Sequence, residues 1–503
     1  MVRFVLGDPQ PVPYVLPRPP VVGELAVDAC APGIPARVLS NPAPGMLLLD
    51  GQDTPVPARQ LAAVAPASHP PQVSLVDDGT VPGAPEHLLV EGENAHVADT
   101  LLGQGWAGRF DVAYLDPPYD TGTRLSYADA RDDWPDFFHA RLVRAKELLH
   151  PERGVLVVAI DDRRLGWARL ICDAVMGQAQ FVACVVWDGG VHGQSRLVSV
   201  AHDYMLIYLT SAAAAKRDRV TWREPRPGVD AALQQAAKVW AATRDVDAAH
   251  KRMLAWYRAL GSDHPAKKLA EYSWFEEGTG RLLRPGPVCK PHAKHYDYDV
   301  IHPGTGKPVP RPGRGYRYSP QRMQELIAEG RILFRDDPAK GIATKLYLDE
   351  MDTRAPHAVF TEARTRAAKR LAAQVGDAAF TYPKDPVVLE RWFRLVTQDR
   401  PDAWFVDLFA GSGSTGEAVM RMNAADGGTR TAVCVTNNEV SAARQETLTG
   451  AGFGPHDPQW RAAGVFETVT APRLRLVAGE TGQGLVVKRL HPSEGAGEAA
   501  VAA

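Results

Sequence analysis

The 503-residue chain is poor in cysteine, in net charge and in long apolar runs. Its five cysteines are scattered without a C-x-x-C pair, which argues against a metal cluster or a disulfide framework and fits a reducing cytoplasm. A formal net charge of -2 means that any contact with nucleic acid needs a local basic patch. The N-terminus lacks an apolar signal region, and no run is long enough to span a bilayer. We therefore expect a cytoplasmic protein with no membrane partner and no metal.

Apolar segments alternate with helical ones in two stretches, residues 86–210 and 376–480. VAYL (112–115) and VLVVAI (155–160) are apolar throughout, which is typical of strands that helices cover on both faces of a mostly parallel sheet. Residues 211–375 have a different character, with a segment dense in Pro, Gly, Arg and Lys. The sequence thus predicts an α/β domain interrupted by an inserted domain.

The two ends of the chain carry no predicted chemistry. Residues 1–80 contain short apolar runs broken by turn signals, which indicate either a small β barrel or a plain packing arm. Residues 481–503 end in a low-complexity string and are predicted to form a disordered tail.

A glycine-rich string, DLFAGSGSTG at residues 407–416, follows an apolar strand and opens a helix. Glycines let the backbone approach a ligand closely, and a helix N-terminus favours polar or anionic groups. The string also satisfies G-x-G-x-x-G, so a NAD-binding Rossmann oxidoreductase is an alternative. Glu439 ends the next strand, where it is either a ligand for a cofactor ribose or a solvated loop carboxylate.

The tetrad Asp116-Pro117-Pro118-Tyr119 comes directly after the strand VAYL. An aromatic exocyclic amine is a poor nucleophile, and the Asp116 carboxylate and the Pro117 carbonyl can each accept one of its hydrogens and favour a localised lone pair. The Tyr119 ring offers a face on which an extruded base can stack. The alternative is a simple proline-rich turn. Ligands of such sheets bind beyond the carboxyl ends of the strands, and the glycine turn falls there too. This shared position favours a catalytic role for the tetrad over a simple turn.

In this order along the chain, the motifs resemble those of beta-class DNA amino-methyltransferases. Longer strings are similar to modification subunits of type III restriction–modification systems: LVEGENAHVADTLL, YLDPPYDTG, VLVVAIDD, AHDYMLIYL, GRGYRYSPQRMQELIAEGRILF and VDLFAGSGSTGEAV. The resemblance covers about residues 86–475. It implies a Rossmann-like S-adenosylmethionine-dependent methyltransferase sheet with helices on both faces, interrupted by a target-recognition domain. It also implies double-stranded DNA as substrate, a homodimer, and a restriction or defence partner subunit.

The resemblance further implies site residues. The catalytic pocket would consist of Asp116, Pro117, Pro118 and Tyr119. The cofactor contacts would be Asp407, Phe409, Ala410, Gly411, Ser412, Gly413 and Glu439, together with Lys384, Asp385 and Pro386 of YPKDP and with Glu93 and Asn94. The chain departs from the family pattern at Asp120, where Asn is usual, at Gly92-Glu93-Asn94, where G-D-N is usual, and at Asp385, which separates a usual lysine–proline pair.

A basic segment between residues 281 and 322 holds nine Lys and Arg side chains, opposed within it only by Asp297 and Asp299, and four tyrosines are interleaved. This pattern predicts a phosphate-binding surface, with a solvated basic loop as the alternative. The candidate DNA contacts are Lys290, Lys294, Arg311, Arg314 and Arg317.

The predicted product is N6-methyladenine, chiefly because of the resemblance. An N4-cytosine enzyme of the same fold remains an alternative, since the tetrad suits either amine. An inactive subunit that binds cofactor and DNA is a further alternative, and the intact tetrad argues against it.

Overall fold

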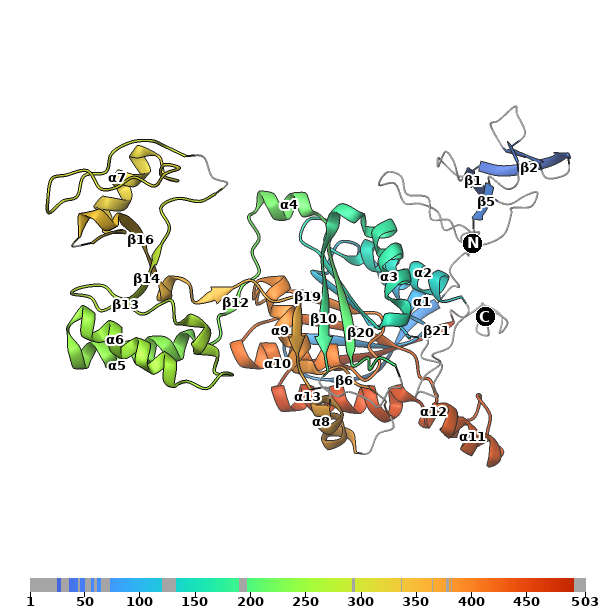
Figure 1. The fold of residues 1–503 in the computed structure, drawn as a ribbon. Coiled ribbons are helices and arrows are strands. Elements are labelled where there is room, and N and C mark those ends of the chain that lie inside the picture. The colour runs from blue at the N-terminus through green and yellow to red at the C-terminus, as the bar shows by residue number, and fades with distance from the viewer. Residues whose placement is uncertain are drawn as a thin grey trace. The chain divides into compact units, whose positions relative to one another are not determined.

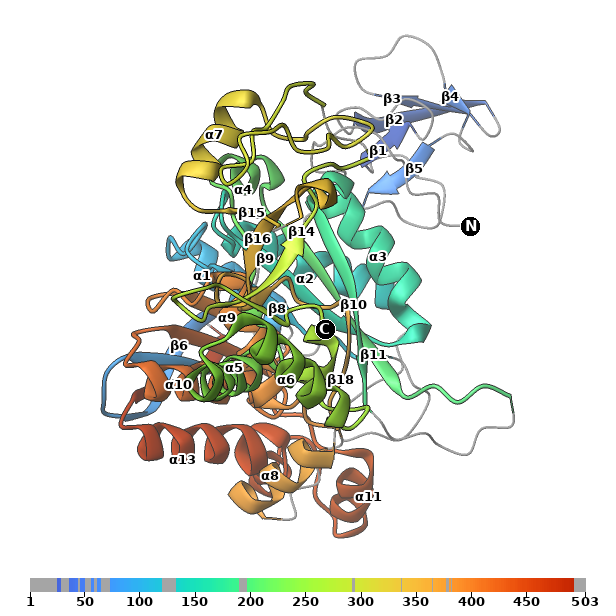
Figure 2. The ribbon, with the colours of Figure 1, turned by 60° about the vertical axis from the view of Figure 1, so that its left-hand side comes forward.

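The computed structural model describes residues 73–119, 133–189, 197–291, 295–335, 337–363, 365–376, 380 and 382–492, and five short strands near the N-terminus. The chain divides into two compact units (Figures 1 and 2). The first consists of Met1–Trp222 and His357–Ala503, and the second is Arg223–Pro356. The second unit is narrower than the predicted insert, 211–375, because α4 (Ala212–Arg217) and the stretch after residue 356 belong to the first unit.

A ten-stranded sheet forms the centre of the first unit, in the order β18-β10-β11-β9-β8-β19-β20-β7-β21-β6. Six neighbouring strands from β9 to β21 are parallel, which confirms the predicted mostly parallel sheet. β11 runs antiparallel to β9. The strands are β6 (Val73–Val81), β7 (Glu86–Glu91), β8 (Val112–Leu115), β9 (Val155–Ile160), β10 (Phe181–Asp188), β11 (His202–Leu209), β18 (Val359–Thr361), β19 (Trp404–Asp407), β20 (Thr431–Thr436) and β21 (Gly484–Pro492).

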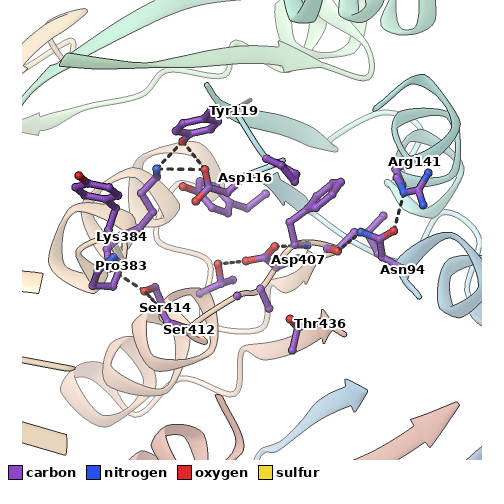
Figure 3. Close-up of a pocket in the computed structure, with 18 of the residues that line it drawn as sticks. Asn94, Asp116, Tyr119, Arg141, Pro383, Lys384, Asp407, Ser412, Ser414 and Thr436 are labelled. Carbon is purple, nitrogen blue, oxygen red and sulfur yellow. Dashed lines mark hydrogen bonds and ion pairs between the residues drawn. The ribbon is translucent and has the colours of Figure 1, made fainter. Parts of the chain in front are cut away.

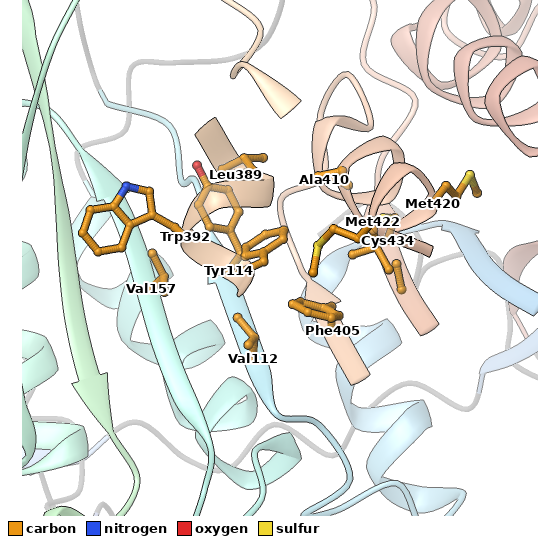
Figure 4. Close-up of a cluster of buried hydrophobic side chains, with 14 of the residues drawn as sticks. Val112, Tyr114, Val157, Leu389, Trp392, Phe405, Ala410, Met420, Met422 and Cys434 are labelled. Carbon is orange, nitrogen blue, oxygen red and sulfur yellow. The ribbon is translucent and has the colours of Figure 1, made fainter. Parts of the chain in front are cut away.

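Helices cover both faces of this sheet, because successive strand residues point to opposite sides and both sets are apolar. In β8, Val112 and Tyr114 join one buried cluster, and Ala113 and Leu115 join the other. The first cluster includes side chains of α9 (Pro386–Thr397), α10 (Ser414–Asp426) and α13 (Ala471–Thr481) (Figure 4). The second includes side chains of α1 (Asn94–Gly103), α2 (Trp134–Leu148) and α3 (Asp162–Met176). The other helices are α4 (Ala212–Arg217), α8 (Thr365–Val375), α11 (Ala442–Gly450) and α12 (Pro458–Ala462).

Both predicted boundaries near the chain ends need correction. The disordered tail predicted from residue 481 is wrong up to Pro492, because β21 pairs in parallel with β7. β21 also pairs antiparallel with β6, which therefore carries the main sheet across the boundary predicted at residue 80. The short apolar run LVV within GLVVKRLHP was the strand signal, and the low-complexity string after it obscured that signal.

The N-terminal stretch contains a separate five-stranded sheet of order β4-β3-β2-β1-β5, whose neighbours are all antiparallel. Its strands are β1 (Leu25–Asp28), β2 (Ala36–Ala43), β3 (Met46–Leu49), β4 (Val56–Pro57) and β5 (Leu61–Val64). Among the residues that the structure describes, no helix combines the length and the apolar character needed to cross a bilayer.

The second unit combines helices with a four-stranded sheet of order β13-β14-β16-β15. Its helical stretch breaks at Arg244, which has a left-handed backbone, into α5 (Val229–Thr243) and α6 (Val246–Ala259). α7 (Pro320–Ala328) begins as predicted, since the Ser319 hydroxyl accepts a hydrogen bond from the Arg322 amide. The sheet consists of β13 (Trp274–Phe275), β14 (Leu282–Gly286), β15 (Ile332–Phe334) and β16 (Ile342–Tyr347).

A short ribbon joins the two ends of this unit. β12 (Glu224–Pro225) pairs antiparallel with β17 (Thr353–Arg354), and the Arg354 guanidinium lies 3.0 Å from the buried Glu224 carboxylate. The chain therefore enters and leaves the unit at neighbouring positions.

Candidate active site

Four strand ends meet at one edge of the main sheet, because β8, β19, β20 and β7 are adjacent and parallel. β8 ends just before the tetrad, and β19 ends at Asp407, where the glycine turn begins. The two strands pair directly, with Tyr114 opposite Asp407. The two motifs predicted to carry catalysis and cofactor binding are thus neighbours, although the second unit separates them in sequence.

A cavity of about 1510 Å³ opens at this edge (Figure 3). Pockets for one small ligand commonly measure about 300–1,000 Å³, so this cavity has room for more than one ligand. Its lining includes the predicted site residues Glu93, Asn94, Asp116, Pro118, Tyr119, Lys384, Asp407, Phe409, Ala410, Gly411, Ser412 and Glu439. Pro117, Gly413, Asp385 and Pro386 are not in the lining.

The tetrad is held by a compact hydrogen-bond network. The Tyr119 hydroxyl donates to the Asp116 carboxylate at 2.5 Å and accepts from the Lys384 ammonium at 2.5 Å. The same ammonium lies 3.2 Å from Asp116 Oδ1. The Pro118 carbonyl accepts a hydrogen bond from the Trp134 indole at 2.5 Å. Both polar ends of the tetrad are therefore fixed before any ligand arrives.

Burial shifts the ionisation of these groups. It raises the pKa of the Asp116 carboxyl above its usual value, and the Lys384 ammonium opposes this shift. Burial, with the nearby Asp116 charge, raises the pKa of the Tyr119 phenol well above its ordinary value, so the phenol remains a neutral donor. Burial also raises the pKa of Asp407 to about 7.

Hydrogen bonds to the Asp407 carboxylate hold the glycine turn in place. Asp407 accepts hydrogen bonds from the Thr415 hydroxyl at 2.5 Å and from the Phe409 amide at 2.9 Å. Gly411 and Gly413 have φ of +47° and +82°, which side-chain-bearing residues rarely adopt. This backbone brings the start of α10 to the cavity.

A buried arginine braces the same turn. Arg473 of α13 donates to the Ser412 carbonyl at 2.9 Å and pairs with Glu417 at 2.8 Å, and both charged side chains have 0% exposure. Removing Glu417 would deprive the buried Arg473 of this carboxylate, whereas Glu417 also pairs with Arg421. Since Arg473 contacts both the Ser412 carbonyl and Glu417, it ties the glycine turn to α10 and α13.

Glu93 and Asn94 lie where β7 passes into α1, and Arg141 of α2 binds both side chains. The Arg141 guanidinium pairs with the Glu93 carboxylate and donates to Asn94 Oδ1 at 2.7 Å. Glu93 also accepts from two amides of α1 as its N-cap. Burial alone would raise the pKa of Glu93, but Arg141 holds that pKa below its usual value. These contacts give Glu93 a structural role that the sequence did not predict.

A family comparison connects this geometry with known proteins. The model of the N6_N4_Mtase family, described as DNA methylase, matches residues 110–426, which is more than half of the chain. The chain belongs to this DNA methylase family. The match begins just before β8 and ends in α10, so it includes both motifs and the second unit between them.

Curated relatives of the chain include Mod subunits of type III restriction-modification enzymes. It is 25% identical to the EcoP15I Mod subunit of Escherichia coli, over 71% of this chain and 60% of that protein. It is 24% identical to the StyLTI Mod subunit of Salmonella typhimurium, over 71% of this chain and 54% of that protein. The chain therefore spans little more than half the length of these relatives.

Among solved structures, the PvuII DNA methyltransferase (cytosine-N4-specific) is 9% identical, with a TM-score of 0.34. The match covers 80% of this chain and 97% of that one. Similarity at this level does not bear on the choice of base.

Within the DNA methylase fold, Asp385 and Pro386 begin helix α9. The Asp385 carboxylate accepts from the Val387 amide at 3.0 Å, and Pro386 occupies the first turn. The structure thus explains the aspartate between lysine and proline as a helix cap. Asp120 lies outside the described residues.

Among the polar lining residues that the sequence analysis did not name, Tyr114, Arg141 and Asp203 contribute most to the site. Arg141 belongs to a helix recognised only by its apolar spacing. Asp203 is the second residue of β11. This strand is antiparallel to β9, so its first residues lie at the same edge as the carboxyl ends of the parallel strands. A polar residue opening an apolar strand, as in AHDYMLIYL, was the available signal. The buried Tyr114 hydroxyl has no hydrogen-bond partner among the described residues, and Tyr114 lines the cavity.

The basic segment is more nearly neutral than its sequence indicates. Acidic residues from outside residues 281–322 pair with it: Arg281 contacts Asp349 and Glu350, Arg284 contacts Glu271, and Arg322 contacts Glu325 and Glu329. Arg311 faces Asp297 and Asp299. The basic side chains without an ion pair to a described residue are Lys290, Lys307, Arg314 and Arg317, and Lys294 lies outside the described residues.

Proposed function

We propose that this chain transfers a methyl group from S-adenosylmethionine to N6 of adenine in double-stranded DNA, at a base extruded into the cavity. The observation that carries the proposal is the direct pairing of β8 and β19, which brings the tetrad and the glycine turn to one cavity. Membership in the DNA methylase family supports the reaction, and the similarity to type III Mod subunits favours adenine.

The cavity fits the cofactor on three observations. Positive φ at Gly411 presents backbone at the lining, and the start of α10 supplies amides suited to polar groups. The unpartnered Tyr114 hydroxyl offers a further buried polar contact among the described residues. The proposed cofactor contacts all line the cavity: Phe409, Ala410, Gly411, Ser412, Glu439, Asn94 and Lys384. Bound S-adenosylmethionine would supply a methyl group activated by its sulfonium.

The chain's own residues prepare the nucleophile. The Asp116 carboxylate accepts one hydrogen of the amine, and the Pro117 carbonyl is proposed to accept the other. The Pro118 carbonyl already accepts from the Trp134 indole, and the role of the Pro117 carbonyl is taken from the resemblance to the family. Tyr119, whose hydroxyl is fixed by Asp116 and Lys384, offers its ring as a stacking face. Placement and preorganised charge, rather than a covalent enzyme intermediate, provide the acceleration.

The alternative of a NAD-binding oxidoreductase explains the glycine string but leaves the tetrad and its network without a task. An inactive binding subunit likewise leaves the buried Asp116–Tyr119–Lys384 network without a task. The N4-cytosine alternative uses the same contacts, so only the product decides it.

We expect that DNA incubated with the full chain and S-adenosylmethionine, then digested to nucleosides, will contain N6-methyladenine. Mass spectrometry with standards for both methylated nucleosides measures this directly. N4-methylcytosine as the sole product would refute the adenine assignment and leave the rest of the proposal standing. Absence of both products, with S-adenosylmethionine bound, would refute the proposed reaction.

The second unit is proposed to read the DNA target, with contacts from Lys290, Arg314 and Arg317. We expect the double variant Arg314→Ala/Arg317→Ala to bind DNA more weakly and to lower the slope of log affinity against log salt by about one to two units. The matched control, Arg281→Ala/Arg322→Ala, removes two arginines whose charges are balanced by carboxylates, and it should leave the slope unchanged. Equal slopes in the two double variants would contradict the proposed DNA contacts.

The relatives are named as subunits of restriction-modification enzymes, which supports a restriction or defence partner as part of this proposal. The homodimer and the cytoplasmic location remain predictions.

A further inference from the structure

Lys384 lies between two carboxylates at the catalytic edge of the sheet. Its ammonium lies 3.2 Å from Asp116 Oδ1 and donates to the Tyr119 hydroxyl (Figure 3). It also lies 3.5 Å from Asp203 Oδ2. The Lys384, Asp203 and Asp116 side chains are 10%, 11% and 22% exposed. Solvent therefore screens this three-group cluster weakly.

The fold specifies the position of Lys384 from several sides. The Lys384 carbonyl accepts a hydrogen bond from the Ser414 hydroxyl of α10 at 2.8 Å. The next residue, Asp385, caps α9. Asp203 is fixed in β11, where it pairs with Trp187 of β10. A lysine anchored in this way is better placed to hold a tetrad than to follow a mobile ligand.

The structure assigns Lys384 as a positioning residue for methyl transfer: its ammonium keeps Asp116 in the carboxylate form and orients Tyr119, while Asp203 shares that ammonium. This assignment rests on the proposed function. It replaces the predicted role of Lys384 as a cofactor contact: the lysine instead supports Asp116, which accepts a hydrogen bond from the attacking amine. Only an ionised Asp116 is a pure hydrogen-bond acceptor, so its charge state decides whether the amine is prepared.

The surrounding charges agree with this role. The groups that face Asp116 are Lys384, Tyr119, Asp203, Tyr114 and Asp407, and Asp203 also acts on Asp161. Burial raises the pKa of Asp116, Lys384 lowers it, and Asp203 raises it. The two neighbours thus shift the pKa of the same carboxyl in opposite directions, so their removal should have effects of opposite sign.

The test is the pH dependence of single-turnover methylation by the full chain. Activity needs ionised Asp116, so the rate falls as pH drops through its pKa. Lys384→Met removes the opposing cation and should move this acid limb upward by about one to three pH units, because that is the effect of an opposite charge at this distance. Asp203→Asn should move the limb downward. Lys384→Arg should keep the limb close to that of wild type.

Two further measurements distinguish a positioning role of Lys384 from direct cofactor binding and from a general effect of losing a lysine. The affinity for S-adenosylmethionine, measured by calorimetry, should change by less than about tenfold in Lys384→Met, because Lys384 is proposed to support Asp116 and not to bind the cofactor. Lys146→Met removes an exposed lysine that donates to the Val175 carbonyl and is not in the cavity lining, and it should leave the profile unchanged. An unmoved limb in Lys384→Met, or an upward or absent shift in Asp203→Asn, overturns the inference. An inactive wild-type chain would instead overturn the proposed function.

If Lys384→Met does not fold, Asp203→Asn and Lys384→Arg still decide the assignment. The assignment of Lys384 is supported if the acid limb of the rate profile moves to lower pH in Asp203→Asn and stays at the wild-type pH in Lys384→Arg. Any other combination refutes the assignment.

Discussion

Asp116→Ala is expected to lower single-turnover methylation by about a thousandfold or more while cofactor affinity stays within a few-fold of wild type. The carboxylate lies at the end of β8 and binds Tyr119 and Lys384, so it acts on the amine and on the tetrad. The glycine turn has its own anchors in Asp407, Thr415 and Arg473, which this substitution leaves intact. Rapid-quench assays give the rate, and calorimetry gives the affinity.

A matched control for Asp116→Ala is Asp173→Ala. Asp173 also accepts from a tyrosine, Tyr208, at 2.7 Å and pairs with a cation, Arg169, but it is not in the cavity lining. Loss of this hydrogen-bonded ion pair should lower stability without stopping catalysis. Wild-type turnover in Asp116→Ala, or equal loss of turnover in both variants, would contradict the role of Asp116.

Gly411→Val is expected to weaken S-adenosylmethionine binding by about a hundredfold or more, because both strain and crowding oppose the native turn. A β-branched residue at φ +47° is strained, at a cost of about 1–3 kcal/mol. A Cβ there would also lie 3.0 Å from the Phe380 ring, which lines the cavity. The affinity is measured by calorimetry, and the melting temperature reports the strain.

Gly427→Val separates strain from loss of the site. Gly427 ends α10 with φ +71°, and an added Cβ there would meet no atom within 4 Å. It should lower the melting temperature and leave cofactor affinity intact. If the two variants bind S-adenosylmethionine equally well, the cofactor does not contact the turn at Gly411.

The sequence predicted the central sheet because its strands are apolar on both faces. VAYL and VLVVAI became β8 and β9 with the predicted bounds, because apolar runs of 4 and 6 residues have the length of strands and are too short for most helices. β21 was missed because the charged residues Lys488 and Arg489 interrupt its apolar run and a low-complexity string follows it directly. Only its long-range pairing with β7 identifies it as a strand of the main sheet.

The parts of the candidate site that consist of one contiguous motif could be predicted from the sequence. The parts that depend on contacts between residues far apart in the sequence could not. The tetrad and the glycine turn are contiguous strings, so their residue types alone indicated their place. The bond of Arg141 to Glu93, by contrast, joins residues 48 positions apart. The neutralisation of Arg281 by Asp349 likewise depends on tertiary contacts, and for this reason counting basic residues exaggerated the charge of the second unit.

The paired strands β12 and β17 have an evolutionary consequence. Since the chain enters and leaves the second unit at adjacent positions, that unit can be replaced as a single cassette without breaking any strand of the ten-stranded sheet. If the unit reads DNA as proposed, one recombination event at this ribbon would give a lineage a new target sequence together with an unaltered catalytic centre.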